Sequence, residues 1–314
     1  MQRKNVSFIL ICAALLGMLL GLTGCNPAED TPEPGKVSVM ATTSVVGDVV
    51  QQIGGEYVQV ELLLPLGTDP HSFTPTPQDI TRLAAARLVF INGAGLEEFL
   101  APMIESADVG LRIVDLSAGI TLRTVDASDH PEGETEDHTG DDPHTWLDPN
   151  NVILWSGVVA EALSAQDPQH AAIYQANADM YIQELSELDR WVVTQVELIP
   201  PENRQLVTDH QVFGYFADRY GFEQVGAIIP GFSTLSEPSA QELAALENAI
   251  QQLNVPALFV GFSVNQNLAQ RIAEDTGIQI VPLYTHSLTP PGGEVDEYTE
   301  LIRYDVNAIV SALK

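Results

Sequence analysis

Among the side chains of this 314-residue sequence, the seven histidines are the clearest candidates for chemistry. Only two cysteines occur, Cys12 and Cys25, and both lie near the N-terminus. The remainder of the chain therefore offers neither a disulfide nor a thiolate. A site for a zinc-like ion would have to use imidazole and carboxylate groups.

Four of the histidines stand in settings that favour ligation of a cation. His71 lies in the segment GTDPHSF, His144 in DPHTWLDP, His210 in VTDH and His286 in YTHS. His71, His210 and His286 follow predicted strands, and open α/β sheets bind ligands at the carboxyl ends of their strands. Because each half of the chain supplies two of the four, we expect a cleft in which both halves share one ion.

Common catalytic motifs are absent from the sequence. There is no Gly-x-x-x-x-Gly-Lys-Ser/Thr phosphate cradle and no His-Glu-x-x-His zinc-protease helix. The turn from Asn92 to Gly95 imitates a dinucleotide-binding turn, but Glu98 would place a carboxylate against the pyrophosphate. We therefore expect a protein that is not an enzyme.

The charge of the chain excludes nucleic acid as a partner. Lys and Arg number 13 against 43 Asp and Glu, a net charge of −30, which repels phosphate groups. Such a surface permits cations as ligands, although it also serves solubility. The hydrophobic content of 45% is ordinary for a globular protein, and the length suggests about two domains.

The N-terminus reads as an export signal. A basic start is followed by an apolar run and by Leu22-Thr23-Gly24-Cys25, which resembles a bacterial lipobox. We predict a lipoprotein signal peptide at 1–24, lipidation of Cys25 and a proline-rich tether at 25–35. The alternative is an N-terminal anchor helix. In both cases the folded part faces the extracellular or periplasmic side of the cell membrane.

From Lys36 onward, short strand-like runs alternate with helical periodicity, which predicts a mainly parallel α/β fold. A long helix at 168–200 between two prolines would act as a rigid link. It would join an N-terminal α/β domain (36–167) to a C-terminal one (201–314). Within the first domain, the stretch 126–142 is acidic and without periodicity, which predicts a solvated loop. Strands are predicted at 37–41, 57–64, 88–91, 111–115, 205–208, 224–228, 257–260 and 278–282. Further helices are predicted at 44–53, 77–86, 239–253, 266–275 and 298–313. Two more helices are predicted, one that begins after Asn150 and one that begins at Val212.

The mature chain resembles the zinc- and manganese-binding proteins of ABC importers, the cluster A-I or ZnuA/TroA-like group. The matching segments, in order, are ATTSVVGDVVQQIGGEYVQVELLLPLGTDPHSFTPTPQD, NGAGLEEFL, DPHTWLDP, VTDHQVFGYFADRYGF and SEPSAQELAAL. Their order and spacing are far more specific than any single motif. The resemblance implies two pseudo-symmetric α/β domains joined by one long rigid helix, with the metal in the inter-domain cleft.

The resemblance also implies a ligand set. His71, His144 and His210 stand where the first three ligands of the family stand. The fourth position, commonly aspartate, is His286 here, so either His286 or a water completes the site. Neutral imidazoles favour Zn²⁺ over Mn²⁺, which prefers oxygen donors, and Mn²⁺ stays the alternative. As hydrogen-bond partners for the histidines, the candidates are Asp148, Asp209 and Glu237, each of which could equally be a helix cap or a solvated acid.

Three other histidines have weaker cases. His130 and His138 lie in the acidic loop, which is either a collector of ions or a plain solvated loop. His170, beside Pro168, is expected to stand at a helix start.

The function expected from this resemblance is capture of zinc and its delivery to an ABC transporter permease by a monomeric lipoprotein. Three alternatives stay open: a manganese-binding homologue, a hydrolase using zinc-bound water, and an adhesin with a structural metal.

Overall fold

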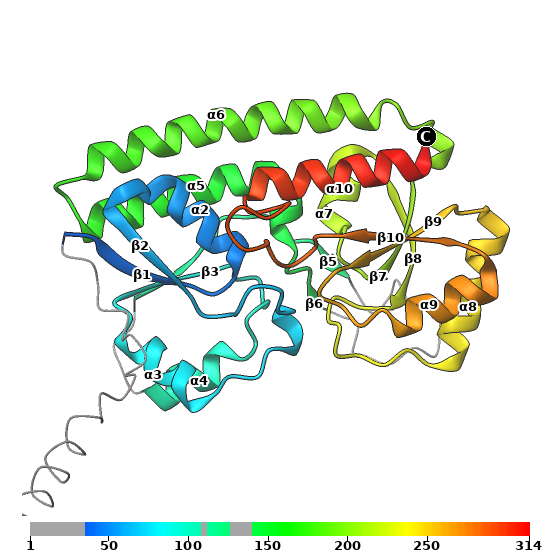
Figure 1. Ribbon diagram of the computed structural model, residues 1–314, viewed down its shortest axis with the longest axis horizontal. Helices are drawn as coiled ribbons and strands as arrows, with labels where there is room; N and C mark the ends of the chain where they lie inside the picture. The colour runs from blue at the N-terminus through cyan, green and yellow to red at the C-terminus, as the bar shows by residue number, and fades with distance from the viewer. Residues whose placement is uncertain (1–34, 108–111, 126–139) are drawn as a thin grey trace, which may run out of the picture. The chain divides into compact units, whose positions relative to one another are not determined.

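A computed structural model of the chain describes residues 35–107, 112–125 and 140–314, which belong to one compact unit (Figure 1). The predicted signal peptide, Cys25, nearly all of the tether, His130 and His138 lie outside the described residues. Among the helices of the described part, none is long and apolar enough to cross a membrane.

Two four-stranded sheets form the framework, and every pair of neighbouring strands in them is parallel. In each sheet the spatial order of the strands is second, first, third, fourth along the chain, so both have the same topology. This confirms the predicted α/β fold with two parallel-sheet domains. The first sheet is β2 (Val58–Leu62), β1 (Val37–Ala41), β3 (Leu88–Ile91) and β4 (Arg112–Asp115), and the second is β8 (Glu223–Ile229), β7 (Gln205–His210), β9 (Ala257–Gly261) and β10 (Gln279–Leu283).

Helices connect the strands, and most begin where the sequence places a capping residue. Thr43 caps α2, while Thr76 and Ser239 form capping boxes with Asp79 and Glu242, which satisfies backbone N–H groups of the first turn. The helices are α2 (Ser44–Gly54), α3 (Pro77–Ala85), α4 (Leu100–Ala107), α5 (Pro149–Gln166), α6 (Ala171–Val196), α7 (Gly214–Tyr220), α8 (Ala240–Leu253), α9 (Asn267–Thr276) and α10 (Tyr298–Leu313).

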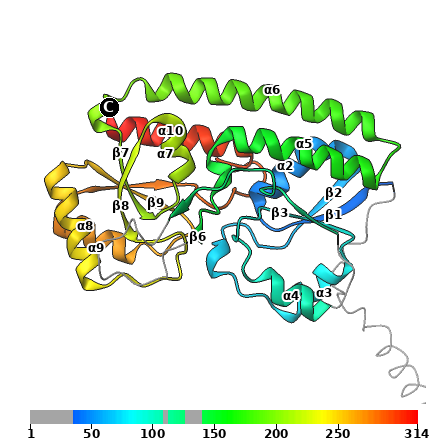
Figure 2. The same ribbon diagram turned by 180° about the vertical axis from the view of Figure 1, so that it is seen from behind.

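The long helix α6 extends along both sheets and packs against α2, α5 and α10 (Figures 1 and 2). It spans 26 residues, fewer than the predicted 168–200. The chain from Asp167 to His170 forms a turn instead, in which the amide of His170 donates to the carbonyl of Asp167. The domain boundaries at 167 and 201 stay a prediction.

One hydrophobic core is shared by the two sheets. Its largest cluster includes Val39 of β1, Trp155 of α5, Leu185 of α6, Phe259 of β9 and Ile309 of α10, all 3% exposed or less. This core therefore connects the two sheets whose strands lead to the four histidine segments.

The sequence did not predict three short elements. Helix α4 has eight residues, too few for a helical period to stand out. Strands β5 (Thr124–Val125) and β6 (Gly140–Asp141) pair as a small antiparallel ribbon. The predicted solvated loop 126–142 is therefore wrong at its end, where residues 140–142 are structured.

Candidate metal centre

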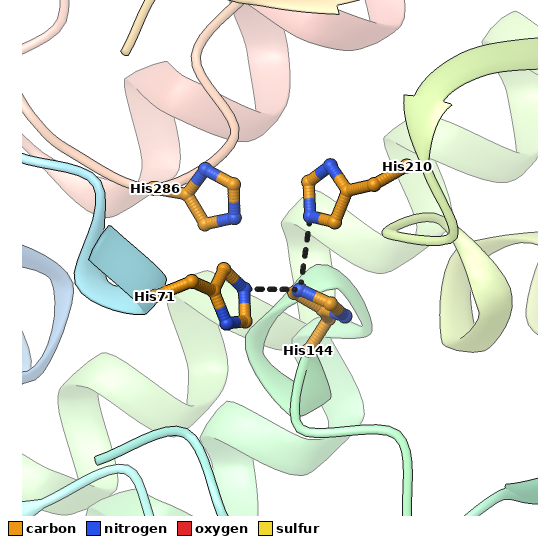
Figure 3. A group of neighbouring side chains, drawn as sticks. All are labelled: His71, His144, His210 and His286. Atoms are coloured by element: carbon orange, nitrogen blue, oxygen red, sulfur yellow. Dashed lines mark hydrogen bonds between the residues drawn. The ribbon is translucent and has the colours of Figure 1, made fainter. Parts of the chain in front are cut away.

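Four histidines from four separate segments of the chain converge on one point (Figure 3). His71 lies in a 3₁₀ turn after β2, His144 precedes the turn Thr145–Leu147, His210 ends β7 and His286 follows β10. One ring nitrogen of each lies within 4.8 Å of those of the others. His144, His210 and His286 are buried, and His71 is partly buried.

Two separations between these nitrogens are close to those of a tetrahedral zinc site. Nε2 of His144 lies 3.2 Å from Nε2 of His71 and 3.2 Å from Nε2 of His210. Four nitrogens at about 2.0–2.1 Å from a tetrahedral zinc ion would lie about 3.3–3.4 Å apart. These two separations are thus close to those that such an ion requires, and all four nitrogens lie within 4.8 Å of one another.

Two of the rings are oriented by aspartates. Nδ1 of His144 lies 2.8 Å from Oδ1 of Asp142, and Nδ1 of His210 lies 2.6 Å from Oδ1 of Asp209. A carboxylate only accepts hydrogen bonds, so each Nδ1 carries the proton and each Nε2 presents its lone pair. This is the tautomer that a metal ion bound at Nε2 needs.

In these tautomers the Nε2 lone pairs of His144 and His210 point toward each other. With both protons on Nδ1, neither Nε2 can donate across the 3.2 Å that separates them. In addition, Nε2 of His286 is buried and has no hydrogen-bond partner. An unpaired buried polar atom is costly, and a cation at the centre would resolve both features at once.

Burial favours the neutral form of three of the four histidines. Burial lowers the pKa of His71, His144 and His286 well below 6.5, and the neighbouring histidines lower it further. Since a metal binds only the deprotonated imidazole, these rings are ready to bind at neutral pH.

His71 is positioned by Asp69. Oδ1 of Asp69 accepts from the backbone amide of His71 at 3.0 Å, and its Oδ2 accepts from the hydroxyl of Thr234. Thr234 follows β8, in the second half of the chain. The loop that carries His71 is therefore fastened across to the other sheet.

His144 is positioned by the segment that follows β3. The side-chain amide of Asn92 donates to the carbonyl of Pro143 at 2.9 Å. Glu97 in turn accepts from the amides of Asn92 and Gly93 and from the hydroxyl of Thr42. Burial raises the pKa of Glu97 to about 7. The turn at Asn92–Gly95, which resembles a dinucleotide-binding turn in sequence, thus supports the loop that carries His144.

His286 is positioned by hydroxyls and by a tryptophan. Its Nδ1 lies 3.0 Å from Oγ1 of Thr285 and 3.4 Å from Oγ of Ser263. The indole N–H of Trp146 donates to the carbonyl of Thr285 at 2.9 Å. In contrast to His144 and His210, His286 has no carboxylate at Nδ1.

The three predicted carboxylate partners have different outcomes. Asp209 does contact His210. Asp148 instead caps α5 through the amide of Asn150, and Glu237 is exposed, so for these two residues the structural role is the correct one. Asp142, which the sequence assigned to the solvated loop, is fully buried against His144.

A local signal for Asp142 was present in the sequence. Asp-Pro-His occurs at both His71 and His144, and in each case the aspartate accepts from the histidine backbone amide two residues later. His170 lies elsewhere, at the start of α6, where Asp167 holds its Nδ1 at 2.6 Å.

A cavity of about 510 Å³ borders the centre beside His71. Carboxylates of Glu98, Asp115 and Asp141 line it, but none of them belongs to the group of mutually close ligand atoms. The centre of the described structure therefore consists of nitrogen donors, with acidic groups further out.

Known proteins with this sequence pattern bind metals. The sequence model of the family described as ZnuA, zinc-uptake complex component A, periplasmic, matches residues 39–312. The manganese-binding lipoprotein MntA of Halalkalibacterium halodurans is 32% identical over 317 residues, which cover 100% of this chain and 99% of the relative. The metal ABC transporter substrate-binding lipoprotein FimA of Streptococcus parasanguinis is 29% identical over 315 residues, 99% of each chain.

Solved structures agree with the sequence relatives. The periplasmic zinc-binding protein TroA of Treponema pallidum aligns with a TM-score of 0.78 at 28% identity, over 89% of this chain and 99% of that one. A manganese-bound periplasmic metal-binding protein from Candidatus Liberibacter asiaticus aligns with a TM-score of 0.76 at 26% identity, over 89% and 100%. The chain therefore belongs to the ZnuA family of metal-binding proteins, the substrate-binding components of ABC importers, which are not enzymes.

Proposed function

We propose that this protein captures Zn²⁺ outside the cytoplasm through His71, His144, His210 and His286, and delivers it to the permease of an ABC importer. The observation that carries the proposal is the pair of 3.2 Å separations between Nε2 atoms in a buried, all-nitrogen pocket. The ion is cargo, so the protein has to bind it tightly and still release it to its partner.

The donor set supports zinc over manganese. Zinc is commonly four-coordinate with imidazole ligands, whereas manganese favours carboxylate, carbonyl and water oxygens. His286 stands where an aspartate is common in the family, so no carboxylate is among the four proposed ligands. An octahedral manganese ion would need further oxygen ligands inside this pocket.

Manganese import is the second candidate. Several curated relatives are named as manganese-binding lipoproteins, including the one at 32% identity. The resemblance to them extends over the whole chain, so the overall sequence favours manganese while the four ligand positions favour zinc.

Attachment to the membrane through a lipid at Cys25 is also part of the proposal. The relatives MntA and FimA are named lipoproteins, and Leu-Thr-Gly-Cys at 22–25 fits acylation of the cysteine. Metabolic labelling with a radioactive fatty acid tests it, because Cys25→Ser should abolish the label.

Metal titration of the metal-stripped protein tests the choice of ion. Zinc and manganese compete for the protein in the presence of a chromogenic chelator, and we expect zinc to bind at least 100-fold more tightly. A preference for manganese would overturn the assignment.

The variant His286→Ala tests the fourth ligand, with His170→Ala as the control. His170 is a partly buried histidine that lies outside the centre, with Asp167 at its Nδ1. An unchanged zinc affinity in His286→Ala would remove this residue from the ligand set.

Uptake of radioactive zinc by cells that make the parent or His144→Ala tests delivery.

A further inference from the structure

Arg123 joins the metal centre to the second half of the chain through two acids. It precedes the ribbon β5–β6, and its side chain is 31% exposed. Its Nη1 lies 2.9 Å from Oδ2 of Asp142, and its Nε lies 2.6 Å from Oδ2 of Asp218 on α7. Asp142 is fully buried, whereas the side chain of Asp218 is 65% exposed.

The two oxygens of Asp142 have separate tasks. Oδ1 accepts from the backbone amide of His144 at 3.0 Å and from its Nδ1 at 2.8 Å. Oδ2 accepts from Arg123. If the bond to Arg123 were lost, the carboxylate could rotate about its terminal torsion, which is broad, and the ring of His144 would lose its fixed partner.

Helix α7 is built to receive this pair. The hydroxyl of Tyr215 donates to the carbonyl of Asp142 at 2.9 Å and accepts from the amide of Arg123 at 3.1 Å. A Cβ atom at Gly214 would lie 1.7 Å from Nη1 of Arg123 and 2.4 Å from Oδ2 of Asp142. Only glycine leaves room for the ion pair at that position.

Building on the proposed function, we propose that Arg123 is a positioning residue of the metal centre. It holds the carboxylate of Asp142 so that Oδ1 keeps the proton of His144 on Nδ1 and the lone pair of Nε2 toward the ion. Because α7 begins four residues after His210, the same contacts tie the segment of His144 to the segment of His210. The guanidinium of Arg123 and the hydroxyl of Tyr215 thus together connect two ligand segments from different halves of the chain.

Lysine cannot replace arginine in this role. The planar guanidinium directs separate N–H groups at two carboxylates, whereas an ammonium group is a single point charge on a flexible stem. Arg123→Lys keeps the charge and loses the geometry, so it separates the two contributions.

The test measures zinc affinity of the full chain, kept in detergent, by competition with a chromogenic chelator. We expect Arg123→Gln to weaken zinc binding about tenfold, the lower end of the range for residues that orient ligands, and Arg123→Lys to restore only part of the loss. The absorption spectrum of bound Co²⁺ should also shift in Arg123→Gln, because the ring of His144 changes its orientation.

Arg82→Gln is the matched control. The side chain of Arg82 is 30% exposed and likewise bridges two acids, Glu61 at 2.6 Å and Asp79 at 3.1 Å, away from the centre. We expect its zinc affinity and Co²⁺ spectrum to equal those of the parent. An equal loss of affinity in both variants would overturn the proposal, because the effect would then be one of general stability.

A double-mutant comparison shows whether Arg123 acts through Asp142. Adding Arg123→Gln to Asp142→Asn should cause no further loss of affinity, since the two changes remove one connection. Additive losses, or a change below twofold in Arg123→Gln alone, would overturn the proposal. If Arg123→Gln does not fold, Asp218→Asn takes its place, and a loss of twofold or more supports the proposal while an unchanged affinity refutes it.

The failure of the proposed function has a different signature. If His144→Ala binds zinc as tightly as the parent, the assignment of the metal centre to these histidines is wrong, whatever the affinities of the Arg123 variants.

Discussion

Replacing Asp209 with asparagine is the sharpest test of how the centre selects its tautomers. Asp209 accepts three hydrogen bonds: at Oδ1 from the backbone amide (2.7 Å) and Nδ1 (2.6 Å) of His210, and at Oδ2 from the amide of Gly261 (2.6 Å). Asparagine has one oxygen for these three donors. Its amide group must therefore face either His210 or Gly261.

Each orientation has a distinct cost. If the NH₂ group faces His210, the ring has to move its proton from Nδ1 to Nε2, where the proton blocks the ion, and the backbone N–H of His210 loses its acceptor. If it faces Gly261, two donors meet and one buried N–H stays unpaired, which costs about 1–3 kcal/mol of folding free energy. The first orientation lowers zinc affinity, and we expect a loss of about 10–100-fold, equal to about 1.4–2.8 kcal/mol.

The assay is competition with a chromogenic chelator at pH 7.5, together with urea unfolding of the metal-free protein. Asp167→Asn is the control, because Asp167 forms the same kind of contact with Nδ1 of His170 at 2.6 Å, outside the centre. Its zinc affinity should stay within twofold of the parent. If Asp209→Asn keeps both its zinc affinity and its stability, the argument from tautomers is wrong.

Three other changes have defined outcomes. Burial raises the pKa of Asp48 to about 6 from 3.8, so the stability gained from its protonated form is complete below pH 3.8 and is lost as the pH rises to 6. In urea unfolding, Asp48→Asn should remove this dependence of stability on pH, and an unchanged dependence would contradict the prediction. Thr234→Val removes the hydroxyl that holds Asp69, and zinc release to excess chelator should become about three- to tenfold faster in stopped-flow measurements, whereas an unchanged rate would count against the contact. Removal of zinc should leave the circular dichroism spectrum nearly unchanged, because the core is apolar. The free energy of unfolding should be about 4 kcal/mol lower without zinc than with zinc at 1,000 times its dissociation constant. Loss of the folded spectrum on removal of zinc would instead indicate a structural metal.

The resemblance to the metal-binding family and the four candidate histidines could be recognised from the sequence because each rests on a short continuous segment. Asp-Pro-His and Thr-Asp-His survive as recognisable segments wherever they lie in the fold. The bounds of β1, β3 and α10 were also predicted to the residue, since an alternating or 3.6-residue apolar period is contained in a short window. Helix α6 was predicted too long because Pro168 and Pro200 lie in the turns outside it.

The partners of the histidines were decided by the tertiary structure. Asp142 and Asp148 both lie within a few residues of His144 in DPHTWLDP, yet one orients the ring and the other caps a helix. Glu237, which the sequence offered alongside Asp148 and Asp209, is exposed.

The sequence by itself determined which residue types are present to form the centre: four imidazoles, no cysteine after Cys25, and alternating α/β elements to carry the histidines. Only the tertiary structure decided that Nε2 of His144 lies 3.2 Å from Nε2 of His71 and 3.2 Å from Nε2 of His210, and that Asp142 and Asp209 set two of the tautomers. The physical reason is that these distances depend on how two parallel sheets pack across one shared core. No window of sequence contains that information, because the contacting residues are separated by 66 and 73 positions.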